Sequence, residues 1–172
     1  MNHIMIEGFM GSGKTAVAKS VAKKAGLPLI DVGKIVVKRM NMSSGDIYDR
    51  FGEVYYRAME TFVLQELSKD ESFERSVIIL SSAIPSIPQN LEFTKKLGKV
   101  YYLKAKKATI IKRLNESEKH KWIREEEGDI TDRVTKLLKE REPGYKKAAD
   151  VTVDVEGKTA DQIADEILAS EG

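Results

Sequence analysis

The sequence contains no cysteine in its 172 residues, which excludes disulfide bonds, thiolate metal sites and thiol nucleophiles. The 29 Lys and Arg residues nearly balance the 27 Asp and Glu residues, so no charge excess points to nucleic acid or to a membrane surface. Long hydrophobic runs are also missing, so neither a signal peptide nor a membrane span is expected. These absences favour a cytoplasmic protein that binds neither nucleic acid nor membranes.

The length and composition predict one globular domain. The hydrophobic fraction of 41% and the charged fraction of 33% are typical of a folded protein with a charged surface. No repeat, linker or low-complexity segment divides the chain, so we expect a single domain over residues 1–172, acting as a monomer. The polar stretch at residues 115–130 is either a mobile flap over a site or an exposed connection.

The clearest motif lies at residues 8–15, where GFMGSGKT fits G-x-x-x-x-G-K-[ST] at every fixed position. An apolar run precedes it and an amphipathic run follows, so strand, glycine loop and helix occur in the required order. The glycines let backbone N–H groups turn toward an anion, and the helix N-terminus adds partial positive charge. We expect nucleotide binding by Gly11, Ser12, Gly13, Lys14, Thr15 and Ala16.

Two side chains of this loop have distinct expected roles. Lys14 can reach the β- and γ-phosphates of the nucleotide, which makes it an expected catalytic residue. The hydroxyl of Thr15 can ligate Mg²⁺. The loop therefore predicts a nucleotide–magnesium complex as its ligand.

Short β-rich stretches alternate with longer helical patterns along the rest of the chain. Strands are expected at residues 3–7, 28–31, 76–81, 99–104 and 151–155. Helices are expected at residues 14–25, 33–41, 44–50, 52–69, 90–97, 107–116, 129–142 and 159–170. This alternation predicts an α/β fold with helices on both faces of a parallel sheet, and ligands at the carboxyl ends of the strands.

Four motifs, in this order, resemble those of the shikimate kinase family, a part of the nucleoside-monophosphate-kinase-like P-loop group. They are the loop at residues 8–15, GLPLIDVG at 26–33, MSSGDIYDRFGEVYYRAME at 42–60 and REPGY at 141–145. The resemblance implies a three-layer α/β/α P-loop kinase fold with a five-stranded parallel sheet. It also implies ATP as donor, Mg²⁺ as cofactor, and γ-phosphoryl transfer to a hydroxyl of shikimate or a related carboxylated polyol, a step in aromatic amino acid biosynthesis.

The resemblance implies that Arg57 and Arg141 hold the carboxylate of the acceptor, a use that suits the fork of a guanidinium group. Glu60 would orient Arg57 or contact the acceptor ring. From the residues alone, other interpretations stay open. Arg57 could pair with Glu53 or Glu60 on the surface of one helix, and Arg141 could pair with nearby glutamates.

The resemblance also places Asp31 near Mg²⁺, through water, and Arg113 against the adenine ring. Both residues have plainer interpretations, since Asp31 could cap the next helix and Arg113 could be a surface charge. The flap lacks the R-P-L-L signature of the family, whose arginine reaches the transferring phosphate. Arg124 is the nearest candidate for that catalytic role, although its spacing differs.

Two further departures from the family pattern fall on the acceptor side. Gly33 stands where the family has the second aspartate of D-x-D, which accepts a hydrogen bond from the reacting hydroxyl. Residues 81–83, Ser-Ser-Ala, replace a glycine triplet, and the hydroxyls of Ser81 and Ser82 either serve a different acceptor or finish a strand. Gly33, Ser81 and Ser82 are all expected at the acceptor site.

Three functions follow from this pattern. The leading hypothesis is a small-molecule kinase of the shikimate kinase type, with the family's acceptor or a changed one. The second is an ATP-binding regulator, or pseudokinase, that has lost phosphoryl transfer, as the altered acceptor residues suggest. The third is a nucleoside or nucleotide kinase, although the sequence shows no aromatic and amide-rich pocket for a second base.

Overall fold

A parallel sheet of five strands forms the centre of the molecule, which the computed structural model describes for residues 1–118, 120, 123 and 127–172. The strands are β1 (His3–Gly8), β2 (Leu29–Asp31), β3 (Val77–Ile79), β4 (Gly98–Lys104) and β5 (Val151–Asp154). Their order is β2-β3-β1-β4-β5, so β1 is the central strand and helical crossovers join the strands. This confirms the predicted α/β fold.

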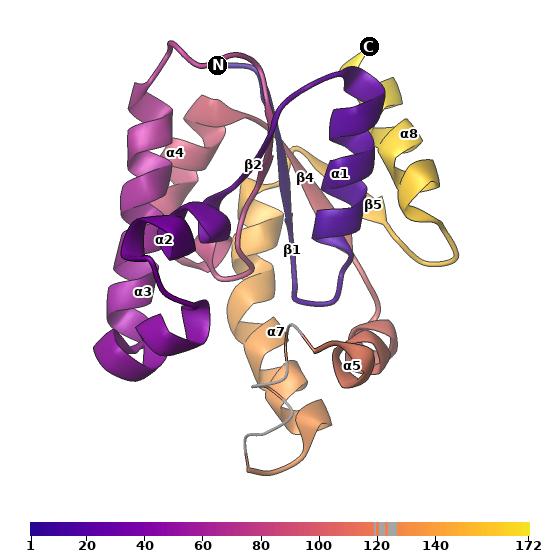
Figure 1. Ribbon diagram of the computed structural model, residues 1–172. Coiled ribbons are helices and arrows are strands. Elements are labelled where there is room, and N and C mark those ends of the chain that lie inside the picture. Colours follow the sequence, from indigo (N-terminus) through magenta and orange to yellow (C-terminus); the bar gives the residue numbers. More distant parts are fainter. Residues whose placement is uncertain (119, 121–122, 124–126) are drawn as a thin grey trace.

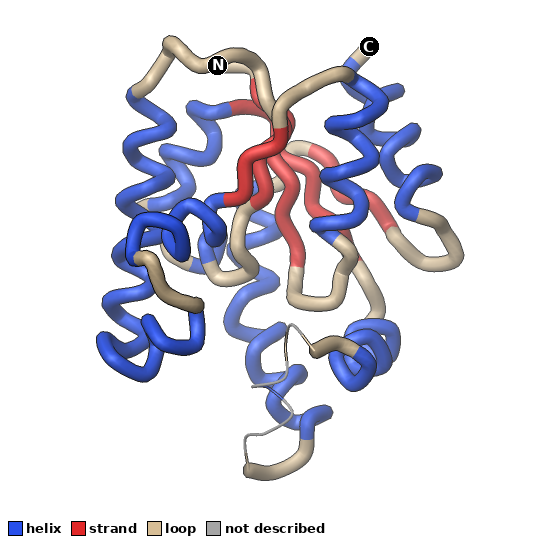
Figure 2. Tube along the Cα trace, in the orientation of Figure 1, coloured by secondary structure: helices blue, strands red, loops and turns tan. Residues whose placement is uncertain are grey.

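Helices cover both faces of the sheet and give three layers (Figure 1). The described helices are α1 (Lys14–Ala25), α2 (Val32–Met40), α3 (Ser44–Lys69), α4 (Asn90–Leu97), α5 (Lys107–Glu116), α7 (Ile130–Ala148) and α8 (Ala160–Glu171), with a short 3₁₀ helix η1 (Ile84–Ser86). α1 and α8 lie on one face, whereas α2, α3 and α4 lie on the other. Both termini lie at the amino ends of the strands, so the loops after the carboxyl ends gather at the opposite edge (Figure 2).

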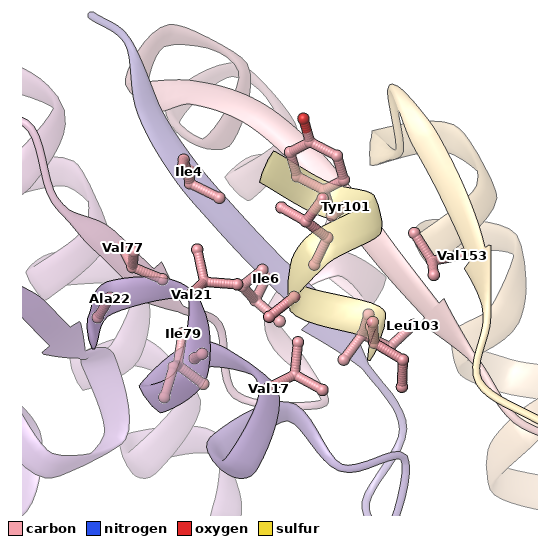
Figure 3. Close-up of a cluster of buried hydrophobic side chains, with 14 of the residues drawn as sticks. Ile4, Ile6, Val17, Val21, Ala22, Val77, Ile79, Tyr101, Leu103 and Val153 are labelled. Carbon is pink, nitrogen blue, oxygen red and sulfur yellow. The ribbon is translucent and has the colours of Figure 1, made fainter. Parts of the chain in front are cut away.

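One apolar core fixes α1, and with it the phosphate loop, against the sheet. Val17 and Val21 of α1 lie one turn apart and pack onto Ile4 and Ile6 of β1 (Figure 3). The strand residues alternate between faces, so the side chain of Met5 joins a second core under α2, α3 and α4. The central strand is therefore buried on both faces.

α7 continues to Ala148, whereas the sequence predicts that this helix ends at residue 142, before Pro143. The prediction was wrong: Pro143 removes one hydrogen bond from the helix interior but does not end the helix. Packing offsets that loss. A Cβ atom on Gly144 would lie 2.2 Å from the carbonyl oxygen of Pro85, so the glycine lets α7 approach the backbone of η1 closely.

Two other boundaries show how local geometry shapes the acceptor side. α3 is bent at Gly52, whose φ of 84° and ψ of 169° are not helical, and this bend lies at the predicted break between residues 50 and 52. β3 ends at Ile79, earlier than the predicted residue 81. The N–H of Leu80 still donates to Ile6, but the N–H of Ile84 then bonds to the carbonyl oxygen of Ser81 and turns the chain.

Among the described residues, no helix combines the length and the apolar character that crossing a membrane requires. The predicted single domain and the predicted monomer stay predictions.

Candidate active site

The phosphate loop lies between β1 and α1, at the carboxyl edge of the sheet. Gly11 and Gly13 have φ angles of 78° and 93°, which place both in the left-handed region that favours glycine. Gly13 is the N-cap of α1, so Lys14, Thr15 and Ala16 form the first turn of that helix. Their position gives the loop the unsatisfied N–H groups and the partial positive charge of a helix N-terminus.

Two cations contact the backbone of this loop. The Lys14 ammonium donates to the carbonyl oxygens of Gly8 at 2.7 Å and Phe9 at 3.2 Å. Arg113 of α5 donates from Nη1 to the carbonyl oxygen of Gly11 at 3.0 Å, which brings a second positive charge to the loop. The structure therefore places Arg113 beside the phosphate loop, and its contact with adenine stays a prediction.

Asp31 lies at the carboxyl end of β2 and caps the next helix. Its Oδ1 accepts a hydrogen bond from the N–H of Lys34 at 3.2 Å, as the plainer interpretation of this residue predicts. The same oxygen lies 3.4 Å from the point where a Cβ atom of Gly33 would stand. Ser81 Oγ lies 3.2 Å and the Tyr56 hydroxyl 3.8 Å from that point. Three polar atoms therefore surround the place of a missing side chain.

Arg57 and Glu60 lie one turn apart on α3 and form an ion pair at the acceptor side. Arg57 Nη1 donates to Glu60 Oε2 at 2.9 Å, and Arg57 Nε lies 3.5 Å from Glu53 Oε1. The guanidinium also lies 5.6 Å and 5.4 Å from the ring centroids of Tyr48 and Tyr56. Both predicted intrahelical pairs are present, and the aromatic rings hold the guanidinium in one place.

The two members of this pair differ in burial. The side chain of Arg57 is 18% exposed, whereas that of Glu60 is 0% exposed. Burial raises the pKa of Glu60, and the adjacent Arg57 and the hydroxyl of Ser81 act to lower it. Burial acts to lower the pKa of Arg57, but Glu60 and Tyr48 outweigh it and raise the pKa. Within this pair Arg57 acts in favour of ionised Glu60, but burial has the larger effect on that carboxyl group and raises its pKa overall.

The motif at residues 141–145 clamps the segment that follows β3. Arg141 Nη1 donates to Ser82 Oγ at 2.8 Å, and the Tyr145 hydroxyl donates to the carbonyl oxygen of Ser82 at 2.5 Å. The Arg141 guanidinium lies 5.7 Å from the ring centroid of Phe9. Burial lowers the pKa of Arg141, although a guanidinium stays protonated at any ordinary pH. Ser82 therefore fixes the direction of this arginine.

Arg57 and Arg141 line one cleft of about 260 Å³ between α3, η1 and α7. Glu53 and Glu140 also line it, and the apolar side chain of Leu137 forms part of its wall. Two guanidinium groups from two different helices thus face the same space. Such a site suits a small molecule that carries a carboxylate.

Arg124 lies outside the described residues, and so do parts of the expected flap at residues 115–130. The role of Arg124 at the transferring phosphate stays a prediction.

Sequence reasoning also missed Glu7, a fully buried acid that directly precedes the phosphate loop. The signal was an acidic residue that continues the apolar run of a strand buried on both faces, where charged residues are rare.

Comparisons with known proteins agree with this geometry. A sequence model of the family described as shikimate kinase matches residues 10–170. A shikimate kinase from Caldanaerobacter subterraneus subsp. tengcongensis is 33% identical over 168 residues, which cover 98% of this chain and 95% of that protein. A solved shikimate kinase from Acinetobacter baumannii, in complex with shikimate, has a TM-score of 0.89 and 27% identity, covering 99% of this chain and 93% of that one. The structure of shikimate kinase from Bacteroides thetaiotaomicron has a TM-score of 0.85 and 25% identity, covering 99% and 96%.

Proposed function

Because this chain belongs to the shikimate kinase family, we propose that its acceptor is shikimate itself or a close cyclic carboxylate with several hydroxyl groups. The chain is an ATP-dependent phosphotransferase that acts on a hydroxyl group. Shikimate is the molecule bound in the similar structure from Acinetobacter baumannii. The proposal therefore concerns which acceptor this chain takes and which residues hold it.

The observation that carries the proposal is the convergence of Arg57 and Arg141 on one cleft. Each guanidinium already has a buried or partly buried partner, Glu60 for Arg57 and Ser82 for Arg141, so each is held before a ligand arrives. Both keep further N–H donors that can bind a carboxylate in the bidentate manner of arginine. We assign the carboxylate of the acceptor to these two side chains.

The reacting hydroxyl then points toward the space above Gly33. Ser81 Oγ, Asp31 Oδ1 and the Tyr56 hydroxyl border that space, and each can exchange a hydrogen bond with an alcohol. Ser81 supplies a polar contact where Gly33 has no side chain to offer one. Phosphoryl transfer depends more on positioning and charge stabilisation than on a strong base, so this arrangement suffices for the reaction.

The donor side supplies the charge stabilisation. Lys14 and the amides of the first turn of α1 would bind the β- and γ-phosphates of ATP, and Arg113 adds positive charge beside Gly11. The hydroxyl of Thr15 and the carboxylate of Asp31 are hard oxygen ligands of the kind that Mg²⁺ takes, and the ion would neutralise phosphate charge when bound. The acceptor oxygen forms a bond to the γ-phosphorus as the bond to the β–γ bridging oxygen breaks, ADP leaves, and the hydroxyl proton passes to a phosphoryl oxygen or to water.

Steady-state turnover with Mg-ATP and shikimate tests this proposal. We expect shikimate to stimulate ADP release in a saturable way. Lys14→Ala should lower kcat by about a hundredfold or more, because a charge-assisted phosphate contact of the transition state is lost. Lys19→Ala, an exposed lysine of the same helix, is the matched control and should turn over at the wild-type rate. If ATP binds but neither shikimate nor a related carboxylated polyol stimulates ADP release, the chain is an ATP-binding regulator instead.

A further inference from the structure

Glu7 places a carboxyl group directly before the phosphate loop, because it is the residue of β1 that precedes Gly8. Glu7 is 0% exposed, and neither of its carboxyl oxygens has a hydrogen-bond partner in the described part of the chain. An ionised carboxylate without partners is among the most costly groups to bury, and such a group takes up a proton instead. The geometry alone therefore favours a neutral carboxylic acid here.

The titratable groups that face Glu7 come from several parts of the fold. Tyr102 is its neighbour on β4, and Tyr145 of α7 lies against Tyr102 with ring centroids 5.1 Å apart. Lys14 of α1 contributes positive charge that favours ionised Glu7, and Asp150, just after α7, contributes negative charge that opposes it. Burial outweighs Lys14 and raises the pKa of Glu7 to about 9.

The other polar groups nearby already have interaction partners of their own. Tyr145 donates its hydroxyl proton to the carbonyl oxygen of Ser82, and Arg141 donates to the Ser82 hydroxyl and lies over the ring of Phe9. Lys14 is therefore the cation whose charge bears most on Glu7 in the described part of the chain. The same lysine is the one that we assign to the phosphates of the nucleotide.

We propose that Glu7 is a positioning residue for Lys14, and that binding of a proton at Glu7 is coupled to binding of the nucleotide at the loop. The neutral acid leaves the ammonium group available to the phosphates. The ionised acid would draw the ammonium toward the floor of the loop and would also repel the phosphates. The protonated protein is thus the form that binds Mg-ATP tightly.

The coupling is reciprocal, because a ligand that prefers the protonated form must also raise the proton affinity of the group. The phosphates bring negative charge near Glu7 and engage the positive charge of Lys14, so both changes favour the neutral acid. A rise of one unit in the pKa of Glu7 on binding corresponds to about tenfold weaker binding by the ionised form. Nucleotide binding near pH 9 should therefore be accompanied by proton uptake.

Isothermal titration calorimetry with Mg-ADP measures this uptake. Titrations at pH 9 in two buffers with different ionisation enthalpies give the number of protons bound with the nucleotide, whose phosphates are already ionised at this pH. We expect the wild-type protein to take up a fraction of a proton at pH 9, and its affinity to fall by about fivefold between pH 7.5 and pH 10. No acceptor is present, so the result is independent of the acceptor proposal.

Glu7→Gln is the decisive variant, because its side chain has the shape of the acid but cannot ionise. We expect its proton uptake to disappear and its affinity to lose the decline that sets in near pH 9. Glu92→Gln, which changes an exposed acid on α4, is the matched control and should keep both. Lys14 is present in every variant, so its own titration cancels from the comparison. If Glu7→Gln takes up as many protons on binding Mg-ADP as the wild-type protein does, the proposal is overturned.

A second measurement observes the acid directly and does not depend on nucleotide binding. The infrared difference spectrum of wild type minus Glu7→Met, recorded at pH 7, should contain the carbonyl band of a protonated carboxylic acid. This band should be replaced by a carboxylate band as the pH rises past 9. A carboxylate band at pH 7 overturns the proposal, even if the glutamine variant fails to fold.

Discussion

Each side of the active site contains a fully buried glutamate, and the two glutamates differ in their partners. Glu60, on the acceptor side, accepts a hydrogen bond from Arg57 at 2.9 Å. Glu7, beneath the donor loop, has no hydrogen-bond partner among the described residues. Both are 0% exposed, so burial alone does not distinguish them.

The comparison shows that the hydrogen-bonding partner determines the role of a buried acid. Paired with an arginine, Glu60 has a cation that opposes the cost of its burial, and it holds a guanidinium in the direction that an acceptor carboxylate requires. Without such a partner, Glu7 meets the cost of burial by keeping its proton. Glu60 is therefore held in a pair with a cation, whereas Glu7 provides a charge that depends on pH and on the nucleotide.

The largest expected effect comes from breaking the paired acid. Arg57→Met should lower the free energy of unfolding at pH 7 by about 3–5 kcal/mol, because it leaves Glu60 buried without its cation. It should also remove saturation by the acceptor, since half of the carboxylate site is lost. Chemical denaturation and steady-state kinetics measure the two effects.

A double variant separates stability from activity at this pair. Arg57→Met combined with Glu60→Leu removes both charges, and we expect most of the lost stability to return while acceptor saturation does not. If the double variant is as unstable as Arg57→Met alone, the ion pair is not the source of the destabilisation.

A smaller effect is expected from removing the unpaired acid. The pKa of Glu7 in the folded protein is about 9, against 4.5 for an ordinary glutamate, so the folded state binds more protons between these values. The stability contribution of Glu7 is therefore fully present below about pH 4.5 and is lost as the pH rises toward 9. Each pH unit above 4.5 removes about 1.4 kcal/mol of this contribution, so at pH 7 about 3 kcal/mol of folding stability has been lost.

Glu7→Met, which puts an unbranched apolar side chain at this position, should cancel this dependence. The stability of the variant relative to wild type should improve by up to about 3 kcal/mol between pH 4.5 and pH 7. Denaturant unfolding at both pH values measures the difference, and any packing defect cancels because it is present at both. A difference that does not change with pH would contradict the assignment of a protonated Glu7.

The smallest expected effect concerns the positioning of Arg141. Ser82→Ala removes one hydrogen bond to this arginine, worth about 1 kcal/mol, so the KM for the acceptor should rise by about fivefold with a smaller change in kcat. Ser76→Ala removes a serine hydroxyl at the opposite end of the sheet and serves as the matched control. An equal rise in both variants would show that Ser82 has no special link to acceptor binding.

Much of the fold could be predicted from the sequence, because the local signals agree with the tertiary structure. The strands with β-branched runs, such as β3, and the glycine-bounded α1 lie within a few residues of their predicted positions. The end of α7 could not be predicted, since the helix passes Pro143 while Gly144 packs against Pro85, 59 residues earlier in the chain. A local pattern does not contain such a contact.

The sequence predicts which residues form the candidate site, but it does not predict which of them contact one another. The motifs point to Lys14, Arg57 and Arg141, yet the bond from Arg141 to Ser82 joins residues 59 positions apart. Glu7 was missed because the apolar run before the loop ends at Ile6, and an acid in the last position of the predicted strand 3–7 looks like the solvent-exposed end of that strand. Only the position of α7 over this part of the sheet shows that the residue is buried.

The clamp between α7 and the segment after β3 has a consequence for the kinetic mechanism. Arg141 is directed by its hydrogen bond to Ser82, and Arg57 by its hydrogen bond to Glu60, and neither bond involves a polar group of the phosphate loop. The two halves of the carboxylate site are thus preorganised, and little ordering entropy remains to be lost when the acceptor enters. We therefore expect substrates to add in random order, with the acceptor able to bind first.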